Sequence, residues 1–177
     1  MDNKLSPNSL AFIALCNEYC MAVEQAARTS RTELITTLTK VLPRLYISAA
    51  DLTAEIMDPD SSISPVLDEQ TYEEVRSRLE QVFGADDTYL EVFHEDMKYS
   101  DTPIAATVSE GLADLFQVCY NFIETVRDAP EYLIEEALAA IKEDFGSYWS
   151  SLLCNVMRPL NQLRYSGAGD DATDDDY

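Results

Sequence analysis

The sequence has few basic residues and contains no long apolar run. Twelve Lys and Arg stand against 33 Asp and Glu, which gives a formal net charge of −21. Affinity for nucleic acids and anionic membranes depends on basic residues that contact phosphates. The twelve basic residues are scattered along the chain, so we expect neither partner. No apolar stretch approaches the roughly 18 residues of a membrane span, and no secretory signal is present. These features predict a soluble, cytoplasmic protein.

Histidine is also scarce, which restricts the chemistry that the chain can support. The single histidine, His94, falls in a predicted connector, and a zinc site would need three or four converging ligands. No P-loop, dinucleotide fingerprint, HExxH helix, EF-hand loop or nucleophile elbow is found. The cysteines form no CxxC pair, and they lie on apolar faces of predicted helices: Cys16, Cys20, Cys119 and Cys154. We therefore expect reduced, buried thiols, no catalytic residue and no cofactor.

What the sequence does contain is helical periodicity, and only five glycines interrupt it. The clearest case is the stretch of residues 102–128, in which apolar residues cover most of the girth of a helix. Such a helix is usually buried against several neighbours, so we expect it to form the centre of the fold. Asp101 is the expected N-cap, Pro103 lies in the first turn, and Pro130 stops the helix. Its main apolar row consists of Val108, Leu112, Leu115, Cys119, Phe122 and Val126.

The same reasoning predicts helices over residues 7–28, 30–56, 69–83, 102–128 and 131–165. Pro43 interrupts the second of these, and we expect a kink or break near residues 39–42. Gly84 ends the third, and the last helix has Gly146 and Pro159 as its possible bending points.

The expected fold is therefore all-α. Residues 1–166 form a single helical bundle of five to six helices, with a kinked second helix and long central and C-terminal helices that pair in antiparallel fashion. Residues 167–177 contain five Asp and almost no apolar residue. This composition predicts a disordered acidic tail.

One polar row of the central helix raises the question of a ligand site. Glu110 and Asp114 are one turn apart on this row, which is hard to solvate fully if the helix is central. In one interpretation the two acids line a pocket with Tyr120, Tyr148 and Trp149. In the other, the acids form a solvated face and the aromatic residues pack in the core. The sequence favours the second interpretation and leaves both open.

A metal site is the more specific functional hypothesis for the acidic residues. Glu55 and Asp58 form an ExxD segment on the expected second helix, and carboxylates on facing helices can hold Mg²⁺ or Mn²⁺. All-helical nucleotide pyrophosphohydrolases have paired segments of this kind, whereas this chain has no ExxE partner on another helix. Glu55 and Asp58 are therefore weak metal candidates.

Three segments resemble an uncharacterised bacterial all-helical family, a domain of unknown function. They are VLPRLYISAADL, TPIAATVSEGLADLFQVCYNFI and IKEDFGSYWSSLLCNVMRPLNQLRY, and the likeness extends over nearly the whole chain except the tail. The best-matching pieces are residues 109–110 and 112–114, followed by residues 146–149. Gly111, Phe116 and Val118 depart from the family pattern, and Val118 replaces an acid, which argues against a shared carboxylate site. The resemblance implies a fold and no activity.

The absence of catalytic motifs favours a non-enzymatic cytosolic protein-interaction or adaptor domain with a protein partner. Two alternatives stay open: a metal-dependent hydrolase with carboxylates on facing helices, and an acidic nucleic-acid mimic that binds a basic protein. The sequence carries no signal for an oligomeric state.

Overall fold

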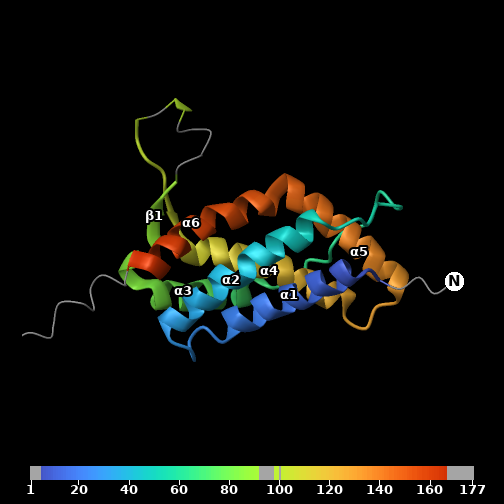
Figure 1. Ribbon diagram of the computed structural model, residues 1–177, viewed down its shortest axis with the longest axis horizontal. Helices are drawn as coiled ribbons and strands as arrows, with labels where there is room; N and C mark the ends of the chain where they lie inside the picture. The colour runs from blue at the N-terminus through green and yellow to red at the C-terminus, as the bar shows by residue number, and fades with distance from the viewer. Residues whose placement is uncertain (1–4, 92–97, 100, 167–177) are drawn as a thin grey trace, which may run out of the picture.

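Five long helical segments, the last of which consists of α5 and α6 joined end to end, form a bundle among the described residues, and a short β-hairpin lies at one end of it (Figure 1). The computed structural model describes residues 5–91, 98–99 and 101–166. The predicted acidic tail and His94 lie outside these residues. The elements in chain order are α1 Pro7–Glu24, α2 Arg31–Ala50, α3 Glu69–Phe83, η1 Gly84–Asp86, β1 Thr88–Leu90, β2 Ala105–Thr107, α4 Val108–Val126, α5 Glu131–Asp144, the π-helical segment Phe145–Trp149 and α6 Ser150–Ser166.

The first three helices begin where the sequence predicts, because each has a polar side chain that caps it. Ser6, Ser30 and Asp68 each accept a hydrogen bond from the backbone N–H three residues later, which satisfies one of the free donors at a helix start. α3 ends at Gly84, as expected. Gly84 has a φ of +54°, a conformation that favours glycine.

α2 ends earlier than the sequence predicts. Its helical run continues through Pro43, so the break that was one of the two expectations near residues 39–42 does not occur, and the helix stops at Ala50 instead of near residue 56. The chain then forms an irregular segment that is anchored to α4. The backbone N–H groups of Val66 and Leu67 donate to Asn121 Oδ1 over 3.1 and 2.8 Å. This contact and the burial of Leu67 favour the irregular path over a longer helix.

α4 is the central helix, as predicted. Every residue of the predicted apolar row is buried, and α4 packs against α1, α3, α5 and α6. The expected start was wrong, however: the helix begins at Val108 with Thr107 as its N-cap, not after Asp101. Residues 105–107 instead form β2, which pairs antiparallel with residues 88–90 of β1. Because β2 pairs with β1, residues 105–107 are extended, and α4 begins after them instead of at the start that the local sequence suggested.

The last helix runs from residue 131 to residue 166 through one π-helical segment. Figure 1 shows the change of direction between α5 and α6 at this segment, which contains the predicted bending point Gly146. Residues 150–166 return alongside the start of α4, so the central and last helices pair in antiparallel fashion. Within the described ranges, no helix is both long and apolar enough to cross a membrane.

The cysteines are free, but only three of the four follow the prediction. Cys16, Cys20 and Cys119 are buried between α1 and α4, whereas Cys154 is exposed on α6. Residues 153, 156 and 160 define the buried side of α6, and Cys154 follows Leu153 by 100° of helix rotation. The predicted burial of Cys154 was therefore wrong because the apolar stripe of α6 is narrower than expected.

Candidate functional site

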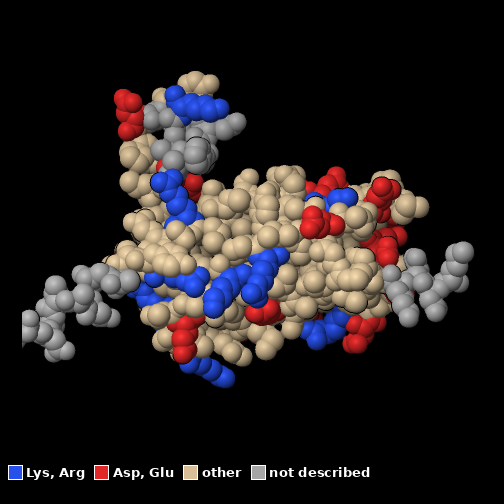
Figure 2. Space-filling model, in the orientation of Figure 1, with Lys and Arg blue, Asp and Glu red and all other residues tan. Residues whose placement is uncertain are grey.

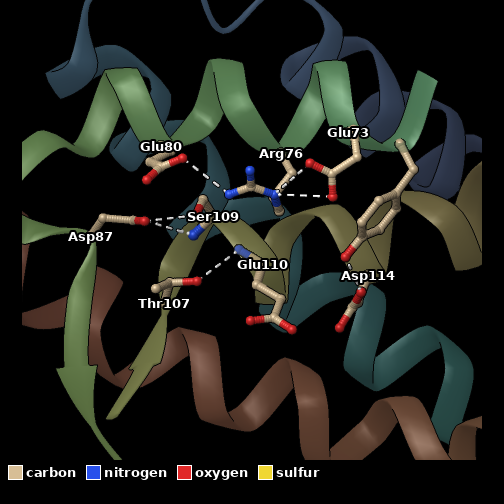
Figure 3. Close-up of polar contacts among 9 residues, drawn as sticks. Glu73, Arg76, Glu80, Asp87, Thr107, Ser109, Glu110 and Asp114 are labelled. Atoms are coloured by element: carbon tan, nitrogen blue, oxygen red, sulfur yellow. Dashed lines mark hydrogen bonds and ion pairs between the residues drawn. The ribbon is translucent and has the colours of Figure 1, made fainter. Parts of the chain in front are cut away.

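The start of α4 is fixed to the hairpin by one buried carboxylate. Asp87 is 4% exposed, and its two carboxylate oxygens accept hydrogen bonds from the backbone N–H and the hydroxyl of Ser109, each over 2.7 Å. The carbonyl oxygen of Asp87 accepts a third bond from the N–H of Val108 over 2.8 Å. Figure 3 shows this arrangement. A negative charge near the N-terminal end of a helix also interacts favourably with the helix dipole. Asp87 therefore stabilises the first turn of α4 in its place beside the hairpin.

A groove lies between the hairpin, the start of α4 and the first two turns of α6. The groove has a volume of about 260 Å³, and apolar atoms of Ile104 and Leu152 form part of its wall. Its acidic groups are Glu91 from the hairpin and Glu110 and Asp114 from α4. In Figure 3 the carboxylates of Glu110 and Asp114 both point into the space between α4 and α6. We call these residues and the hollow between them the acidic groove.

Asp114 is the carboxylate at the inner side of the acidic groove, and its partner is a phenol from α3. The Tyr72 hydroxyl donates to Asp114 Oδ1 over 2.6 Å. Burial raises the pKa of Asp114 above its ordinary value; the hydrogen bond from Tyr72 opposes this shift, and repulsion by Glu110 adds to it. Burial and the hydrogen bond to Asp114 likewise raise the pKa of Tyr72, so Tyr72 stays a neutral donor at physiological pH.

Two further tyrosines lie within the electrostatic influence of these acids. Burial, reinforced by Glu91 and Glu110, raises the pKa of Tyr89 to about 12. Burial and repulsion by Asp114 and Glu110 raise the pKa of Tyr148. None of the described residues that line the groove is Lys or Arg. The site therefore combines uncompensated negative charge with neutral phenols, which suits a cationic group.

The structure brings together only some of the residues that the sequence proposed. Glu110 and Asp114 share the groove, and Tyr148 lies close enough for their charges to act on it. Tyr120 packs instead against Phe116, with ring centroids 5.5 Å apart. Trp149 is fully buried, and its indole N–H donates to the carbonyl oxygen of Ile141 over 3.2 Å. Neither Tyr120 nor Trp149 lines the groove with the acids, as one interpretation of the sequence had it: Trp149 lies in the core, and Tyr120 is partly buried against it.

The weak metal candidates do not face another acidic helix. Glu55 and Asp58 are exposed in the irregular segment after α2, because that helix ends earlier than expected. Asp58 Oδ1 accepts a hydrogen bond from the N–H of Asp60 over 3.0 Å, an ordinary turn contact. In the part of the chain that the structure describes, no group of three or more His, Cys, Asp or Glu side chains is placed to hold a metal ion.

Sequence reasoning missed three residues of the site: Tyr72, Tyr89 and Glu91. Tyr72 belongs to the apolar stripe of α3, and Tyr89 and Glu91 belong to a connector without periodicity. No local pattern distinguishes them from residues that merely cover the core. Only the pairing of β1 with β2 and the packing of α3 on α4 place them beside Glu110 and Asp114.

A larger hollow of about 510 Å³ lies between α1 and α2, near the connection between them. Met21, Ala22, Leu34 and several threonines form much of its wall. Its two acids, Glu18 and Glu33, were not among the candidate residues. We regard the smaller acidic groove as the better candidate because three carboxylates line it. The pKa values of two of its lining residues, Tyr89 and Asp114, are raised by burial and by neighbouring acids, which is typical of functional sites.

Comparisons with known proteins agree with the fold. The family model described as a domain of unknown function, DUF5063, matches residues 3–166. The chain belongs to the DUF5063 family. A crystal structure of protein BF1032 from Bacteroides fragilis superposes with a TM-score of 0.77 at 28% sequence identity, and the match covers 91% of this chain and 94% of that one. No match was found among curated proteins. Neither finding names an activity.

Proposed function

We propose that this protein is a non-enzymatic protein-interaction domain of the cytoplasm whose acidic groove receives a basic side chain of a partner polypeptide. The observation that carries the proposal is the convergence of Glu91, Glu110 and Asp114 in one hollow whose described lining contains no cation. The buried thiols of Cys16 and Cys20 fit a reducing compartment.

The size of the acidic groove supports a side chain as the ligand. Its volume of about 260 Å³ lies below the roughly 300–1,000 Å³ of typical small-molecule sites. An extended Lys or Arg side chain can place its apolar stem against Ile104 and Leu152 and its charge beside the carboxylates. Because apolar residues lie beside the carboxylates, the groove favours a cation with an apolar stem over a compact metal ion.

The hairpin supplies a way to bind the backbone of the same partner. β1 and β2 pair with each other, and neither has a second strand partner among the described residues. An unpaired strand edge can accept an extended peptide by main-chain hydrogen bonds. A peptide added to this edge would run beside the groove and present alternate side chains to it.

Asp114 also fits a binding role on energetic grounds. Its folded-state pKa is raised, so the folded protein holds the proton more tightly than the unfolded chain does. Ionisation of Asp114 therefore lowers stability as the pH rises from the unfolded pKa to the folded pKa. A half-buried acid that is unfavourable for the fold is common where a site serves function. The metal-dependent hydrolase and the nucleic-acid mimic have no comparable observation in their favour.

The test uses fluorescent peptides in which one Lys, one Arg or one norleucine stands within an extended Thr/Val/Ser background, with binding followed by anisotropy. We expect the Lys or Arg peptide to bind and the norleucine peptide to bind at least about tenfold more weakly, since a partly buried ion pair contributes on the order of 1–2 kcal/mol. Glu110→Gln with Asp114→Asn should remove this preference.

A matched control carries Glu131→Gln and Glu143→Gln, which remove the same charge from exposed positions on α5. The control should retain the preference for the cationic peptide. Equal loss in both variants would show a response to net charge alone. Equal binding of the norleucine and Lys peptides would refute the groove as a cation site.

A further inference from the structure

α2 and α6 pack side by side, and together they carry an excess of basic residues that the linear sequence does not reveal. Residues 34–50 of α2 include Lys40 and Arg44, and residues 150–166 of α6 include Arg158 and Arg164, while neither stretch contains an Asp or Glu. Arg164 reaches across to α2, where its guanidinium donates to the Thr39 hydroxyl over 2.8 Å. Figure 2 shows Lys and Arg side chains gathered over α2 on this side of the molecule.

These cations have no acidic partner within the described part of the chain, although acids outnumber bases by 33 to 12. The ion pairs among the described residues involve Arg31, Arg76 and Arg127. Lys40 and Arg44 are exposed and take part in none of them. In a chain this acidic, a surface on which cations lie together without acids is the exception. We call Lys40, Arg44 and Arg164 with their exposed surroundings the basic face.

The basic face also exposes apolar and aromatic groups. Ile47, which lies about one helical turn beyond Arg44, is 61% exposed. Tyr165 is 63% exposed, and the guanidinium of Arg164 lies 5.1 Å from its ring centroid. Arginine, tyrosine and large apolar residues are enriched where proteins bind one another.

The dimensions of the basic face favour a short ligand. Lys40 and Arg44 are separated by about 6 Å along the helix, since each residue rises 1.5 Å. Alternate residues of an extended peptide are about 6.6 Å apart, so two carboxylates of such a peptide can meet both cations. A duplex or an anionic bilayer would extend beyond this narrow face and meet the negative charge of the remaining molecule. At physiological salt, charges more than about 8 Å away are largely screened. A short acidic segment on the basic face is therefore affected mainly by the nearby cations and little by the net negative charge of the whole protein.

We propose that the basic face of α2 and α6 is a docking site for a short acidic polypeptide segment of a partner protein. The site is separate from the acidic groove and does not depend on the proposed function of the groove. Each Arg can bind a carboxylate through two parallel N–H donors, and Ile47 provides a contact for an apolar residue that follows the acids. An adaptor with one acidic and one basic surface can hold two partners of opposite charge.

The experiment measures binding of a fluorescein-labelled hexa-aspartate peptide to the full chain by anisotropy at low and physiological salt. We expect saturable binding that weakens as salt rises. Lys40→Gln with Arg44→Gln should weaken binding about fivefold, because each exposed ion pair contributes up to about a factor of five. The matched control, Arg28→Gln with Arg127→Gln, removes two exposed cations elsewhere and should change binding less than about twofold. Thermal unfolding of both variants checks that each stays folded.

Four results would each overturn the proposal. The first is a lack of saturable binding at low salt. The second is equal weakening by the control, which would mean that net charge alone determines binding. The third is tighter binding of single-stranded DNA or phosphatidylserine vesicles that depends on Lys40 and Arg44. The fourth is tighter peptide binding after removal of residues 167–177, which would assign the basic face to the chain's own acidic residues instead of a partner.

Discussion

Gly111 of α4 lies directly against Val156 of α6, and Gly111→Ala tests that contact. A methyl group built on Gly111 would lie 2.2 Å from Cγ1 of Val156 and 4.0 Å from Cδ1 of Leu152. Val156 is fully buried, and a β-branched residue in a helix has one strongly preferred rotamer. The clash can therefore be relieved only by moving the Val156 side chain off its rotamer or by separating the two helices.

The expected magnitude follows from two opposing effects. Alanine is about 1 kcal/mol better than glycine inside a helix. Overpacking a dense core costs about 1–3 kcal/mol, and a contact of 2.2 Å places this site at the upper end. We expect Gly111→Ala to lower the free energy of unfolding by about 1–2 kcal/mol, which corresponds to a fall in Tm of about 2–8 °C for a chain of this length.

The assay is urea unfolding followed by circular dichroism, with Gly146→Ala as the matched control. Gly146 also lies within a helical run, but a methyl group there would meet nothing within 4 Å. It should be neutral or stabilise by up to about 1 kcal/mol. Val156→Ala should cost about 1–3 kcal/mol alone. The double variant Gly111→Ala with Val156→Ala should be more stable, by at least about 1 kcal/mol, than the sum of the two single destabilisations predicts. The reason is that Val156→Ala vacates the space that the new methyl group at position 111 fills.

Two results would refute this reasoning. One is stabilisation by Gly111→Ala to the same extent as by Gly146→Ala, which would mean that helix propensity alone governs the site. The other is a double variant whose cost equals the sum of the single costs. In that case Gly111 and Val156 would not be in contact.

Three further predictions concern the surroundings of the acidic groove and the thiols. Asp87→Ala should lower the free energy of unfolding by about 1.5–3 kcal/mol in urea melts, because it removes charged hydrogen bonds at a buried helix start. The control is Asp86→Ala, which removes an exposed ion pair and should lower the free energy of unfolding by less than about 1 kcal/mol. Tyr72→Phe should raise the pKa of Asp114 further, since the hydrogen bond from Tyr72 lowers it; a carboxyl NMR titration that shows a fall would contradict this. A thiol reagent should modify Cys154 rapidly and the three buried thiols only after unfolding, whereas rapid modification of all four would contradict the packing of α1 on α4.

Much of the fold could be predicted because its signals are local. The caps at Ser6, Ser30 and Asp68 and the stop at Gly84 depend on side chains within a few residues of each helix end. The apolar row of α4 identified the most buried helix, because a helix that is apolar over most of its girth is stable in water only when several neighbours cover it.

The errors occurred where distant parts of the chain meet. Residues 105–107 have no strand signal of their own. They become β2 because residues 88–90 pair with them and Asp87 accepts hydrogen bonds from Ser109 at the start of α4. α2 ends early because the following segment finds hydrogen-bond partners on Asn121 of α4. A local sequence pattern cannot predict an interaction that depends on where a distant element packs.

The candidate site divides in the same way. The sequence by itself determined that Glu110 and Asp114 share one helix face, because the α-helix has a fixed period. It also determined the large excess of acids over bases. Only the tertiary structure decided that this face borders a groove and that Tyr72 bonds Asp114. It likewise brought basic residues of α2 and α6 onto one surface. The physical reason is that periodicity fixes directions within one helix, whereas the charge and polarity of a site arise from side chains on several elements whose relative positions depend on packing.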